Sequence, residues 1–481
     1  MILIGLDLGT QGVRAVAADA SGTVLATAAA HYEQINTAPE PYKEQDAAHW
    51  RAAALAVLSQ LSAALGPVEH EEPVLLAVDG TSGTILPLDQ QGNPLCHALM
   101  YNDGRSAAVL DTVRRHARPL EETLGYSVGA SFALPKLYWF QQHRPDLYEK
   151  TWRFVHQADY LVGCLTGEFG VTDYSNALKT CYDLVHNCWP SALLDALSID
   201  ASLLPSVVAP GTPIGPITAA AAAETGLPRQ TIVTAGATDG YASCVASGVV
   251  RPGQYNTTIG TTLVLKGVTQ QLIRDPQGRV YCHKHPEGYW YPGGAGNVGG
   301  ICLNQWFGAD AFDRLNAQVP DTAPTGNLIY PLTTTGERFP FVCPTAQGFS
   351  LLRRDDEVGR YAGTMEGVAY VERLCYDTLT GLGCAVGEEI TIAGGAVKSP
   401  QWSQIRADVL GRCLVQPETV EAAFGMAMIA GTAALRRTLT EAAGAMVRTV
   451  RRFEPRESVH AIYNEYYEAF LAACRERGYL D

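Results

Sequence analysis

The sequence has few of the features that mark secreted or membrane-spanning proteins. Its 12 cysteines are scattered, with no Cys-x-x-Cys pair and no framework of close spacings, so we expect reduced, buried thiols rather than disulfides. No basic, apolar leader precedes the first predicted strand. The longest weakly polar run, Ala422 to Leu435, contains Gly425 and Gly431 and is too short to span a bilayer. These absences predict a soluble, cytoplasmic protein with no membrane partner.

Positive charge is also scarce. The chain carries 35 Lys and Arg residues against 49 Asp and Glu residues, which gives a formal net charge of −14 at pH 7. This balance argues against a nucleic-acid partner and against an anionic membrane surface. Any anionic ligand must therefore be bound by donors that the fold gathers locally.

The composition is that of a large globular protein. Hydrophobic residues make up 47% of the chain and charged residues 17%, and there is no low-complexity tract or block of like charge. A length of 481 residues exceeds one typical core, and a length-based prior gives about two or three domains.

Hydrophobic patterning predicts two halves of similar plan. The chain opens with three predicted strands and a helix, at residues 2–7, 12–19, 23–30 and 46–65. The strand-turn-strand theme recurs at residues 256–265 around a Gly-Thr-Thr turn. We expect the boundary near residue 248, with one domain over residues 1–248 and another over residues 249–481.

A phosphate-binding turn is indicated directly after the first strand. Gly9 and Gly12 let the backbone turn sharply and expose N–H groups, and Thr10 adds a hydroxyl donor. Asp7, at the end of the strand, can hold a divalent cation or its water. The alternative is an ordinary β-hairpin whose aspartate accepts turn hydrogen bonds.

Short strings spread along the chain occur in the order known from one enzyme family. They are the opening strand and turn, Glu44-Gln45-Asp46 with Trp50, Tyr101-Asn102-Asp103-Gly104-Arg105, Gly236-Ala237-Thr238-Asp239-Gly240, Gly260-Thr261-Thr262, Gly336-Glu337-Arg338 and Gly394-Gly395-Ala396-Val397-Lys398-Ser399-Pro400. Together they resemble the FGGY family of carbohydrate kinases, from residue 2 to about residue 435. The resemblance implies an α/β protein of two actin-like, ribonuclease-H-like domains that face each other across a catalytic cleft. The first domain would hold mainly the sugar and the second mainly the nucleotide.

The implied reaction transfers a phosphoryl group from ATP to a sugar hydroxyl. Such a reaction needs donors on the phosphates, a cation and a proton acceptor. We expect the phosphate donors at Gly9-Thr10-Gln11 and at Gly260-Thr261-Thr262, since turn N–H groups and hydroxyls add no fixed charge. Asp7 is the candidate for Mg²⁺, held through water because Mg²⁺ keeps much of its hydration shell.

Asp239 is the candidate general base. It follows a strand of apolar and small residues and precedes Gly240, so its carboxylate can stand at a strand end. By resemblance, Asp239 binds the sugar and accepts the proton of its primary hydroxyl. The alternative is an aspartate that caps the helix beginning near Tyr241, and one residue can serve both purposes.

The sugar contacts are expected in the first domain. Asp103 offers acceptors and Arg105 a fork of donors, which suits adjacent hydroxyl groups. The alternatives are a plain turn at Asp103 and a salt bridge of Arg105 at a helix start. Ser82 and Gly83, in a loop after a second apolar strand, form a further predicted contact.

The chain departs from the familiar xylulose kinases at this loop. They carry a Met-His pair where Ser82-Gly83 stands here. A smaller wall without histidine changes which hydroxyl stereochemistry fits. The string from Asp79 to Thr84 resembles the ribulose-kinase-like branch, so D-ribulose, converted to D-ribulose 5-phosphate, is the first expected substrate and D-xylulose the second.

The nucleotide is expected at a strand-turn-helix unit of the second domain. Gly394, Gly395 and Ala396 allow close backbone approach between a strand and the helix that starts at Pro400. Ser399 is the predicted N-cap of that helix. The resemblance also places Gly425, in a helix predicted to pack closely on the sheet, near the adenine.

Two other features are expected to be structural. His283 and His285 share one face of a strand with no Cys or carboxylate at ligand spacing, so zinc is not expected. The run Gly293 to Gly300 lacks the Lys-Ser/Thr ending of a P-loop and fits a loop that enters a helix.

A second class of function stays open. An actin-like ATPase or nucleotide-driven switch could use the same fold to bind a protein without phosphorylating a sugar. Such a switch needs neither the base Asp239 nor the pair Asp103 and Arg105, so the kinase is favoured. We expect a monomer or a homodimer that binds a sugar and ATP with Mg²⁺.

Overall fold

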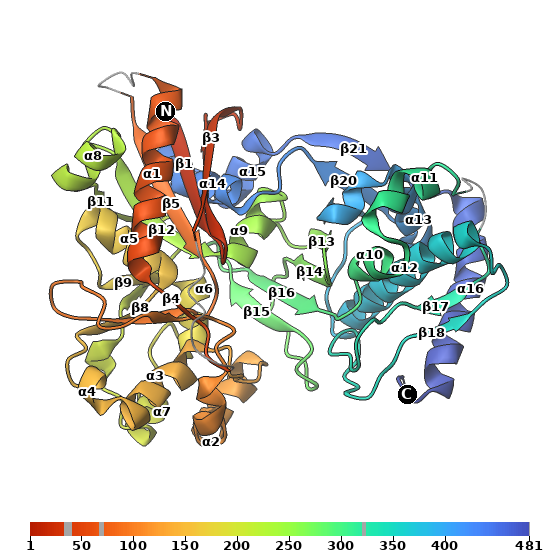
Figure 1. The fold of residues 1–481 in the computed structure, drawn as a ribbon, viewed down its shortest axis with the longest axis horizontal. Coiled ribbons are helices and arrows are strands. Elements are labelled where there is room, and N and C mark those ends of the chain that lie inside the picture. Colours follow the sequence, from red (N-terminus) through yellow and green to blue (C-terminus); the bar gives the residue numbers. More distant parts are fainter. Residues whose placement is uncertain (33–40, 67–71, 320–323, 481) are drawn as a thin grey trace. The chain divides into compact units, whose positions relative to one another are not determined.

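The structure is a computed structural model that describes residues 1–32, 41–66, 72–319 and 324–480 (Figure 1). Within the chain, two compact units can be distinguished, and each is built from separate stretches of sequence. The first contains Met1–Val250, His283–Gly288 and Thr419–Val447. The second contains Arg251–Cys282, Tyr289–Glu418 and Arg448–Asp481. The expected domain ranges treat each domain as one stretch of chain and stay a prediction.

The first unit is built on a mixed sheet. In the described part of the chain its strand order is β11-β12-β5-β1-β2-β3, formed by β1 (Ile2–Leu8), β2 (Gly12–Ala18), β3 (Val24–His31), β5 (Val74–Gly80), β11 (Pro213–Pro216) and β12 (Ile232–Thr238). β1 pairs antiparallel with β2 and parallel with β5, and β12 pairs parallel with β5. Every residue of β1 and β5 is buried, as the continuous apolar runs of central strands require. The three predicted opening strands are confirmed.

Helices cover both faces of this sheet. Ile4, Leu6 and Leu8 belong to the core shared with α1 (Ala47–Leu65) and α5 (Gln157–Thr166). On the opposite face α14 (Ala422–Leu435) lies against β1 and α9 (Asp239–Ala246). A Cβ at Gly5 would lie 1.7 Å from the carbonyl oxygen of Ala423, so only glycine lets this helix approach the strand. The predicted close packing of the 421–433 helix on a sheet is confirmed, and the sheet belongs to the first unit.

A smaller sheet and several helices complete the first unit. The small sheet has the order β4-β7-β6-β8, from β4 (Glu44–Gln45), β6 (Ile85–Leu88), β7 (Ala98–Leu99) and β8 (Arg153–His156). The remaining elements of this unit are η1 (Arg105–Val109), α2 (Leu110–Leu124), α3 (Ala133–His143), α4 (Pro145–Tyr148), β9 (Val171–Asp173), α6 (Tyr174–Ala177), η2 (Leu178–Thr180), α7 (Ser191–Ala196), η3 (Ala201–Leu203), β10 (Ser206–Val208), α8 (Ala219–Thr225) and α15 (Leu439–Met446).

The second unit repeats the pairing scheme of the first. The central strands are β13 (Tyr255–Ile259), β14 (Leu263–Gly267) and β19 (Glu389–Ala393). β13 pairs antiparallel with β14 and parallel with β19, as β1 does with β2 and β5. The sheet continues outward through β15 (Tyr281–Lys284), β16 (Trp290–Ala295), β20 (Cys413–Pro417) and β21 (Thr449–Phe453). The predicted hairpin at residues 256–265 is confirmed.

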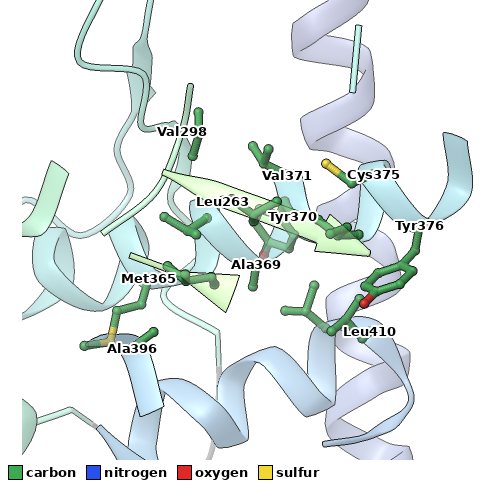
Figure 2. Packing of buried hydrophobic residues seen from close by; sticks show 14 of the residues in the cluster. Leu263, Val298, Met365, Ala369, Tyr370, Val371, Cys375, Tyr376, Ala396 and Leu410 are labelled. Carbon is green, nitrogen blue, oxygen red and sulfur yellow. The ribbon is translucent and has the colours of Figure 1, made fainter. Parts of the chain in front are cut away.

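A long helix forms the centre of the second unit. α12 (Glu357–Gly381) starts at the N-cap Asp356, whose side chain accepts from the Gly359 N–H. Its residues Met365, Ala369 and Tyr370 lie in the same apolar cluster as Leu263 of β14 and Leu410, the last residue of α13 (Pro400–Leu410) (Figure 2). The other elements are α10 (Ile301–Phe307), η4 (Ala309–Ala311), α11 (Phe312–Asn316), β17 (Leu328–Tyr330), β18 (Phe349–Leu351), η5 (Gly395–Lys398), α13 (Pro400–Leu410) and α16 (Glu457–Glu476).

None of the helices in the described ranges is both long and apolar enough to cross a membrane.

Candidate active site

The carboxyl edge of the first sheet gathers acidic residues. Asp7 of β1 and Asp79 of β5 are register partners in the parallel pair, and Ala237 of β12 is the partner of Asp79 on its other side. Asp239 follows two residues after Ala237, as the first residue of α9. Because parallel strands end at one edge, the topology brings these three carboxylates together. The sequence interpretation singled out Asp7 and Asp239 but not Asp79.

Asp79 is fully buried, and neither of its carboxylate oxygens has a hydrogen-bond partner among the described residues. Burial raises the pKa of Asp79 well above its usual range, and the negative charges of Asp7, Asp239 and Asp173 raise it further. The sequence did contain a signal for Asp79. It directly follows an apolar run, as Asp7 does in the first strand.

Asp239 is the more accessible carboxylate of this edge. It is half-buried, and its Oδ1 accepts the main-chain N–H of Gly240 at 2.6 Å. The N-cap of α9 is Thr238, so Asp239 occupies the first helical position. The positive end of the helix dipole stabilises its negative charge there. A Cβ at Gly236 would lie 1.6 Å from the carbonyl oxygen of Val78, which explains the glycine before this aspartate. The alternative of an aspartate that caps a helix beginning near Tyr241 is therefore wrong, because α9 begins at Asp239 itself. The role of Asp239 as the base stays a prediction.

The residues at this edge suit a hydrated Mg²⁺. Their donors are carboxylate oxygens, which is the ligand type that Mg²⁺ prefers. Asp7 is 9% exposed, and the Nη1 atom of Arg14 lies 3.6 Å from its Oδ2. Within the described residues, no three His, Cys, Asp or Glu side chains are arranged to ligate one ion directly. Binding of Mg²⁺ through water at Asp7 stays a prediction.

The opening turn is held from behind by side chains. The Gly9 N–H donates to the Gly12 carbonyl at 3.0 Å, and Tyr32 donates its hydroxyl to the Gly9 carbonyl. Gln45 Nε2 donates to the Thr10 carbonyl at 2.8 Å. Gln11 lies exposed at the tip. The Gly9 N–H and the carbonyls of Gly9 and Thr10 are thus bound within the protein, and phosphate binding by this turn stays a prediction.

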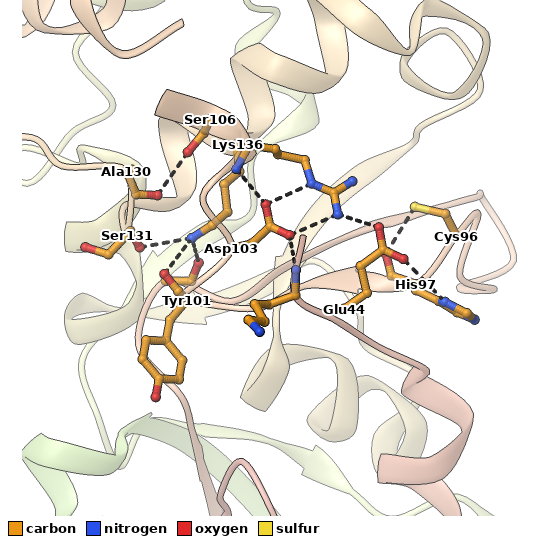
Figure 3. Close-up of polar contacts among 12 residues, drawn as sticks. Glu44, Cys96, His97, Tyr101, Asp103, Ser106, Ala130, Ser131 and Lys136 are labelled. Carbon is orange, nitrogen blue, oxygen red and sulfur yellow. Dashed lines mark hydrogen bonds and ion pairs between the residues drawn. The ribbon is translucent and has the colours of Figure 1, made fainter. Parts of the chain in front are cut away.

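Asp103, which is labelled in Figure 3, forms an ion pair with Arg105. Asp103 is 1% exposed, and its Oδ1 accepts the main-chain N–H and the Nε of Arg105 at 3.0 and 2.8 Å. Its Oδ2 accepts Arg105 Nη2 and the Lys43 N–H at 2.9 and 2.6 Å. Arg105 also donates to Glu44 and stacks on Trp139 and Tyr42. Four donors thus bind the Asp103 carboxylate. Arg105 therefore forms the salt bridge at a helix start that the sequence analysis gave as the alternative to a sugar contact. A sugar contact by either residue stays a prediction.

The loop at Ser82 and Gly83 differs from the ion pair of Asp103 and Arg105 in how its polar atoms are hydrogen-bonded. Ser82 Oγ is buried and has no hydrogen-bond partner in the described part of the chain. Gly83 has φ +89°, and a Cβ there would lie 2.2 Å from the Ser131 carbonyl oxygen, so no other residue fits without a backbone shift. The Gln157 Oε1 atom accepts the N–H and the hydroxyl of Thr81 at 2.9 and 2.8 Å, which fixes the start of the loop.

The second unit contains a pocket of about 470 Å³. Of the predicted nucleotide residues, Gly260, Thr261, Gly395 and Ala396 line it, whereas Thr262 and Gly394 are not among its lining residues. Gly394 has φ +86°, and a Cβ there would lie 2.4 Å from the Ile259 carbonyl oxygen. Gly394 thus supports the turn from behind. The remaining lining residues are Ile259, Gly300, Ile301, Leu303, Asn304, Ala309, Phe312, Asp313, Asn316, Tyr361, Lys398, Ser399 and Trp402.

The glycine-rich run from Gly293 to Gly300 packs on the phosphate turn of this pocket. The Gly300 N–H donates to the Gly260 carbonyl at 2.8 Å. A Cβ at Gly299 would lie 2.4 Å from the Thr262 Cα. The prediction of a loop that enters a helix is confirmed for the end of the run, which leads into α10, whereas its first three residues, Gly293 to Ala295, belong to β16.

One wall of the pocket is a hydroxyl and amide cluster that the sequence interpretation missed. Ser399 caps α13, as predicted, with its Oγ accepting the Trp402 N–H at 3.2 Å. The same Oγ donates to Asn316 Oδ1 at 2.9 Å, and the Tyr361 hydroxyl donates to that oxygen at 3.2 Å. Burial raises the pKa of Tyr361 to about 12. Asn316 and Tyr361 come from separate helices with no shared motif, so no local pattern could have linked them.

Gly425 lies in α14 of the first unit. A Cβ at this position would lie 2.0 Å from the Ala242 carbonyl oxygen, so the contact between α14 and α9 accounts for the glycine. Its proximity to adenine stays a prediction.

Comparison with known proteins shows the family. The family model of the N-terminal domain of the FGGY family of carbohydrate kinases matches residues 2–246, and that of the C-terminal domain of the same family matches residues 255–434. The chain belongs to the FGGY family of carbohydrate kinases. This FGGY kinase is thus a phosphotransferase with an alcohol group as acceptor, and it uses ATP and a sugar.

Individual relatives of this FGGY kinase cover almost the whole chain. The "Xylulose kinase" of Bacillus subtilis (strain 168) is 26% identical over 97% of this chain and 95% of its own length. The "Autoinducer-2 kinase" of Klebsiella pneumoniae is 28% identical over 96% of this chain and 92% of its own length.

Solved structures agree with the sequence relatives. A structure described as a xyloylose kinase from Brucella ovis has a TM-score of 0.90 and 26% identity and covers 100% of both chains. The xylulose kinase from Rhodospirillum rubrum has a TM-score of 0.87 and 27% identity, with 99% of both chains covered. The expected α/β fold with two actin-like domains is confirmed.

Proposed function

We propose that this kinase phosphorylates a ketopentose at its terminal primary hydroxyl, with D-ribulose as the first substrate and D-ribulose 5-phosphate as the product. The observation that carries the proposal is the wall at Ser82 and Gly83. The positive φ of Gly83 and its contact with Ser131 leave no room for the histidine of familiar xylulose kinases. Ser82, which stands in the place of the methionine, has a buried hydroxyl with no hydrogen-bond partner among the described residues, and this hydroxyl can both donate to and accept from a sugar hydroxyl.

D-Xylulose is the second candidate. Several similar proteins carry the name xylulose kinase, and this favours the same pentulose class. Others are named autoinducer-2 kinases at 28% identity, so the names of the relatives alone do not select a substrate. The substitution of the Met-His pair by Ser82-Gly83 is our reason for ranking D-ribulose first.

The residues present can perform the transfer as follows. The sugar's primary oxygen attacks the γ-phosphorus while the bond from that phosphorus to the β–γ bridging oxygen breaks, and ADP leaves. Asp239 accepts the proton of the attacking hydroxyl. The turns Gly9-Thr10-Gln11 and Gly260-Thr261-Thr262 stabilise the phosphate charge through their hydroxyls and through N–H groups other than those of Gly9 and Gly260, which donate to the Gly12 and Thr262 carbonyls. Asp7 would hold Mg²⁺ through water, and the bound ion would supply neutralisation of phosphate charge.

We also propose that the enzyme works in the cytoplasm. Each of its 12 cysteines is a thiol, and Cys181, Cys302 and Cys375 are among those that are buried. Thiols are kept reduced in that compartment. A fluorescent fusion expressed in the native host would test the location.

An ADP-release assay tests the substrate. The panel is D-ribulose, L-ribulose, D-xylulose, L-xylulose, ribitol, glycerol and autoinducer-2, each at several concentrations with ATP and Mg²⁺. We expect the highest kcat/KM for D-ribulose, and the Asp239→Asn variant serves as the catalytic control. A highest value for D-xylulose would select the second candidate. No turnover across the panel, with ATP hydrolysis retained, would favour a nucleotide-driven switch.

A further inference from the structure

A buried lysine stands behind the predicted sugar loops. Lys136, in α3, is 0% exposed. Its Nζ donates to the carbonyl oxygens of Gly83 at 2.9 Å, Ser131 at 3.1 Å and Tyr101 at 3.3 Å (Figure 3). An ammonium group has three protons, so three carbonyls satisfy it fully. This satisfaction allows a charge to be buried that would otherwise be strongly unfavourable.

The three carbonyls come from segments that are far apart in the sequence. Gly83 follows Ser82 in the loop after β5, and Tyr101 stands two residues before Asp103. Ser131 lies just before α3, and its carbonyl oxygen is the atom that a Cβ at Gly83 would meet at 2.2 Å. Two of these segments therefore carry predicted sugar contacts, and the lysine joins them to the third.

The lysine does not serve as the ion-pair partner of the nearby carboxylate. The four donors to Asp103 come from Arg105 and the Lys43 main chain. The donors of Lys136 go to main-chain carbonyls instead. An apolar side chain of similar length would fill the space but would leave three buried acceptors without donors, which is unfavourable. The specific role of the ammonium group is therefore to bind the three main-chain carbonyls and fix the backbone that carries them.

We propose that Lys136 is a positioning residue for the sugar, whose ammonium holds the main chain at Gly83, Tyr101 and Ser131 so that the Ser82 hydroxyl keeps the direction needed to bind a sugar hydroxyl. The inference rests on the proposed function and deepens it. Lys136 itself touches no reacting atom, and its effect passes through the loops that it joins.

The charge of Lys136 gives a readout in the unmodified enzyme. Burial lowers the pKa of Lys136 to about 7, the Asp103 carboxylate raises it, and the cations of Lys179 and Arg105 lower it. As the pH rises through that value, the ammonium loses one proton and with it one donor. We expect kcat/KM for the sugar to fall between pH 6 and pH 9 while KM for ATP stays constant. A flat profile for the sugar would contradict the proposal.

Substitution gives a second readout. Lys136→Met removes the charge and keeps the length, and it should raise KM for the sugar about tenfold or more with KM for ATP nearly unchanged. Lys136→Arg keeps the cation and should restore part of the sugar affinity and abolish the pH dependence. The matched control is Leu137→Ala, a fully buried neighbour in the same helix, which should destabilise the fold and leave KM for the sugar nearly unchanged.

Equal increases of both KM values in Lys136→Met, or a sugar KM like that of Leu137→Ala, would overturn the proposal. A third measurement needs no turnover. Amide hydrogen exchange in the segments around Gly83, Tyr101 and Ser131 should accelerate in Lys136→Met but not in Leu137→Ala, and unchanged exchange there would refute the positioning role. If no sugar is phosphorylated by the wild-type enzyme, the proposed function fails while hydrogen exchange still decides the role of Lys136.

Discussion

The region of the first unit around Asp103 and the pocket of the second unit differ in the kind of polar groups that they contain. Around Asp103, charged side chains are buried and bound to one another or to backbone, as Arg105 and Lys136 show. In the pocket of the second unit, glycine and threonine turns, Ser399 and the amide of Asn316 form the wall. Fixed, charged side chains can hold loops that distinguish hydroxyl groups, whereas phosphates need N–H groups that can approach closely. The buried charges Glu372 and Arg406 of the second unit lie outside the lining of this pocket, in α12 and α13.

The largest expected effect tests whether the acid–base chemistry belongs to the first unit. Asp239→Asn removes the proposed proton acceptor and should lower kcat by about 10²- to 10⁴-fold. KM for ATP should change little, because the pocket predicted to bind the nucleotide is in the second unit. Sugar-dependent ADP release measures the first value and nucleotide titration the second. Activity near that of the wild type would assign the base to another residue.

The second test asks whether the buried charges of the second unit serve stability alone. Glu372 and Arg406 are both fully buried and form two hydrogen bonds of 2.7 and 2.8 Å. Glu372→Gln leaves the guanidinium uncompensated and should destabilise the fold by about 3–5 kcal/mol, measured by urea unfolding. KM for ATP should stay constant in the folded variant. A large change in KM would mean that this pair shapes the pocket as well.

Glu366 gives a pH-dependent version of the same test. Burial raises its pKa to about 7 from the ordinary 4.5, although Thr325 and Tyr463 donate to it. Between these values the folded state keeps a proton that the unfolded state has lost. Stability should therefore fall by about 3 kcal/mol as the pH rises from 4.5 to 7.

Glu366→Gln, which stays neutral, should remove this part of the pH dependence. Thermal unfolding of both proteins at pH 5, 6, 7 and 8 measures the effect, because their difference in Tm should grow toward pH 8 in favour of the variant. Parallel curves across that range would show that Glu366 is ionised in the folded protein.

The smallest expected effect tests the neutral donors of the pocket. Thr261 lines the pocket in the turn beside Gly260. Thr261→Val removes one hydroxyl donor and should raise KM for ATP about tenfold, while KM for the sugar remains as in the wild type. Thr261→Ser keeps the hydroxyl and is the matched control. Equal ATP affinity in the valine and wild-type proteins would exclude this hydroxyl as a phosphate contact.

Local patterns predicted elements and turns well. The opening strands, the hairpin at 256–265 and the cap at Ser399 depend on neighbouring residues, so each could be read from the chain and is confirmed. The interpretation of Asp103 and Arg105 was less complete, because the ion pair that occupies them involves Glu44 and Lys43, about sixty residues earlier. Asn316 was missed for the same reason, whereas Asp79 had a local signal in its place after an apolar run.

From the sequence alone one can determine the family, the order of the elements and the residue types available for phosphoryl transfer, because motifs and periodicity are local properties. Only the tertiary structure decides which polar atoms are already satisfied. It shows the Asp103 carboxylate occupied by four donors, while the Ser82 hydroxyl and the Asp79 oxygens have no partner among the described residues. Hydrogen bonds across long sequence distances determine this satisfaction, and no local pattern records them.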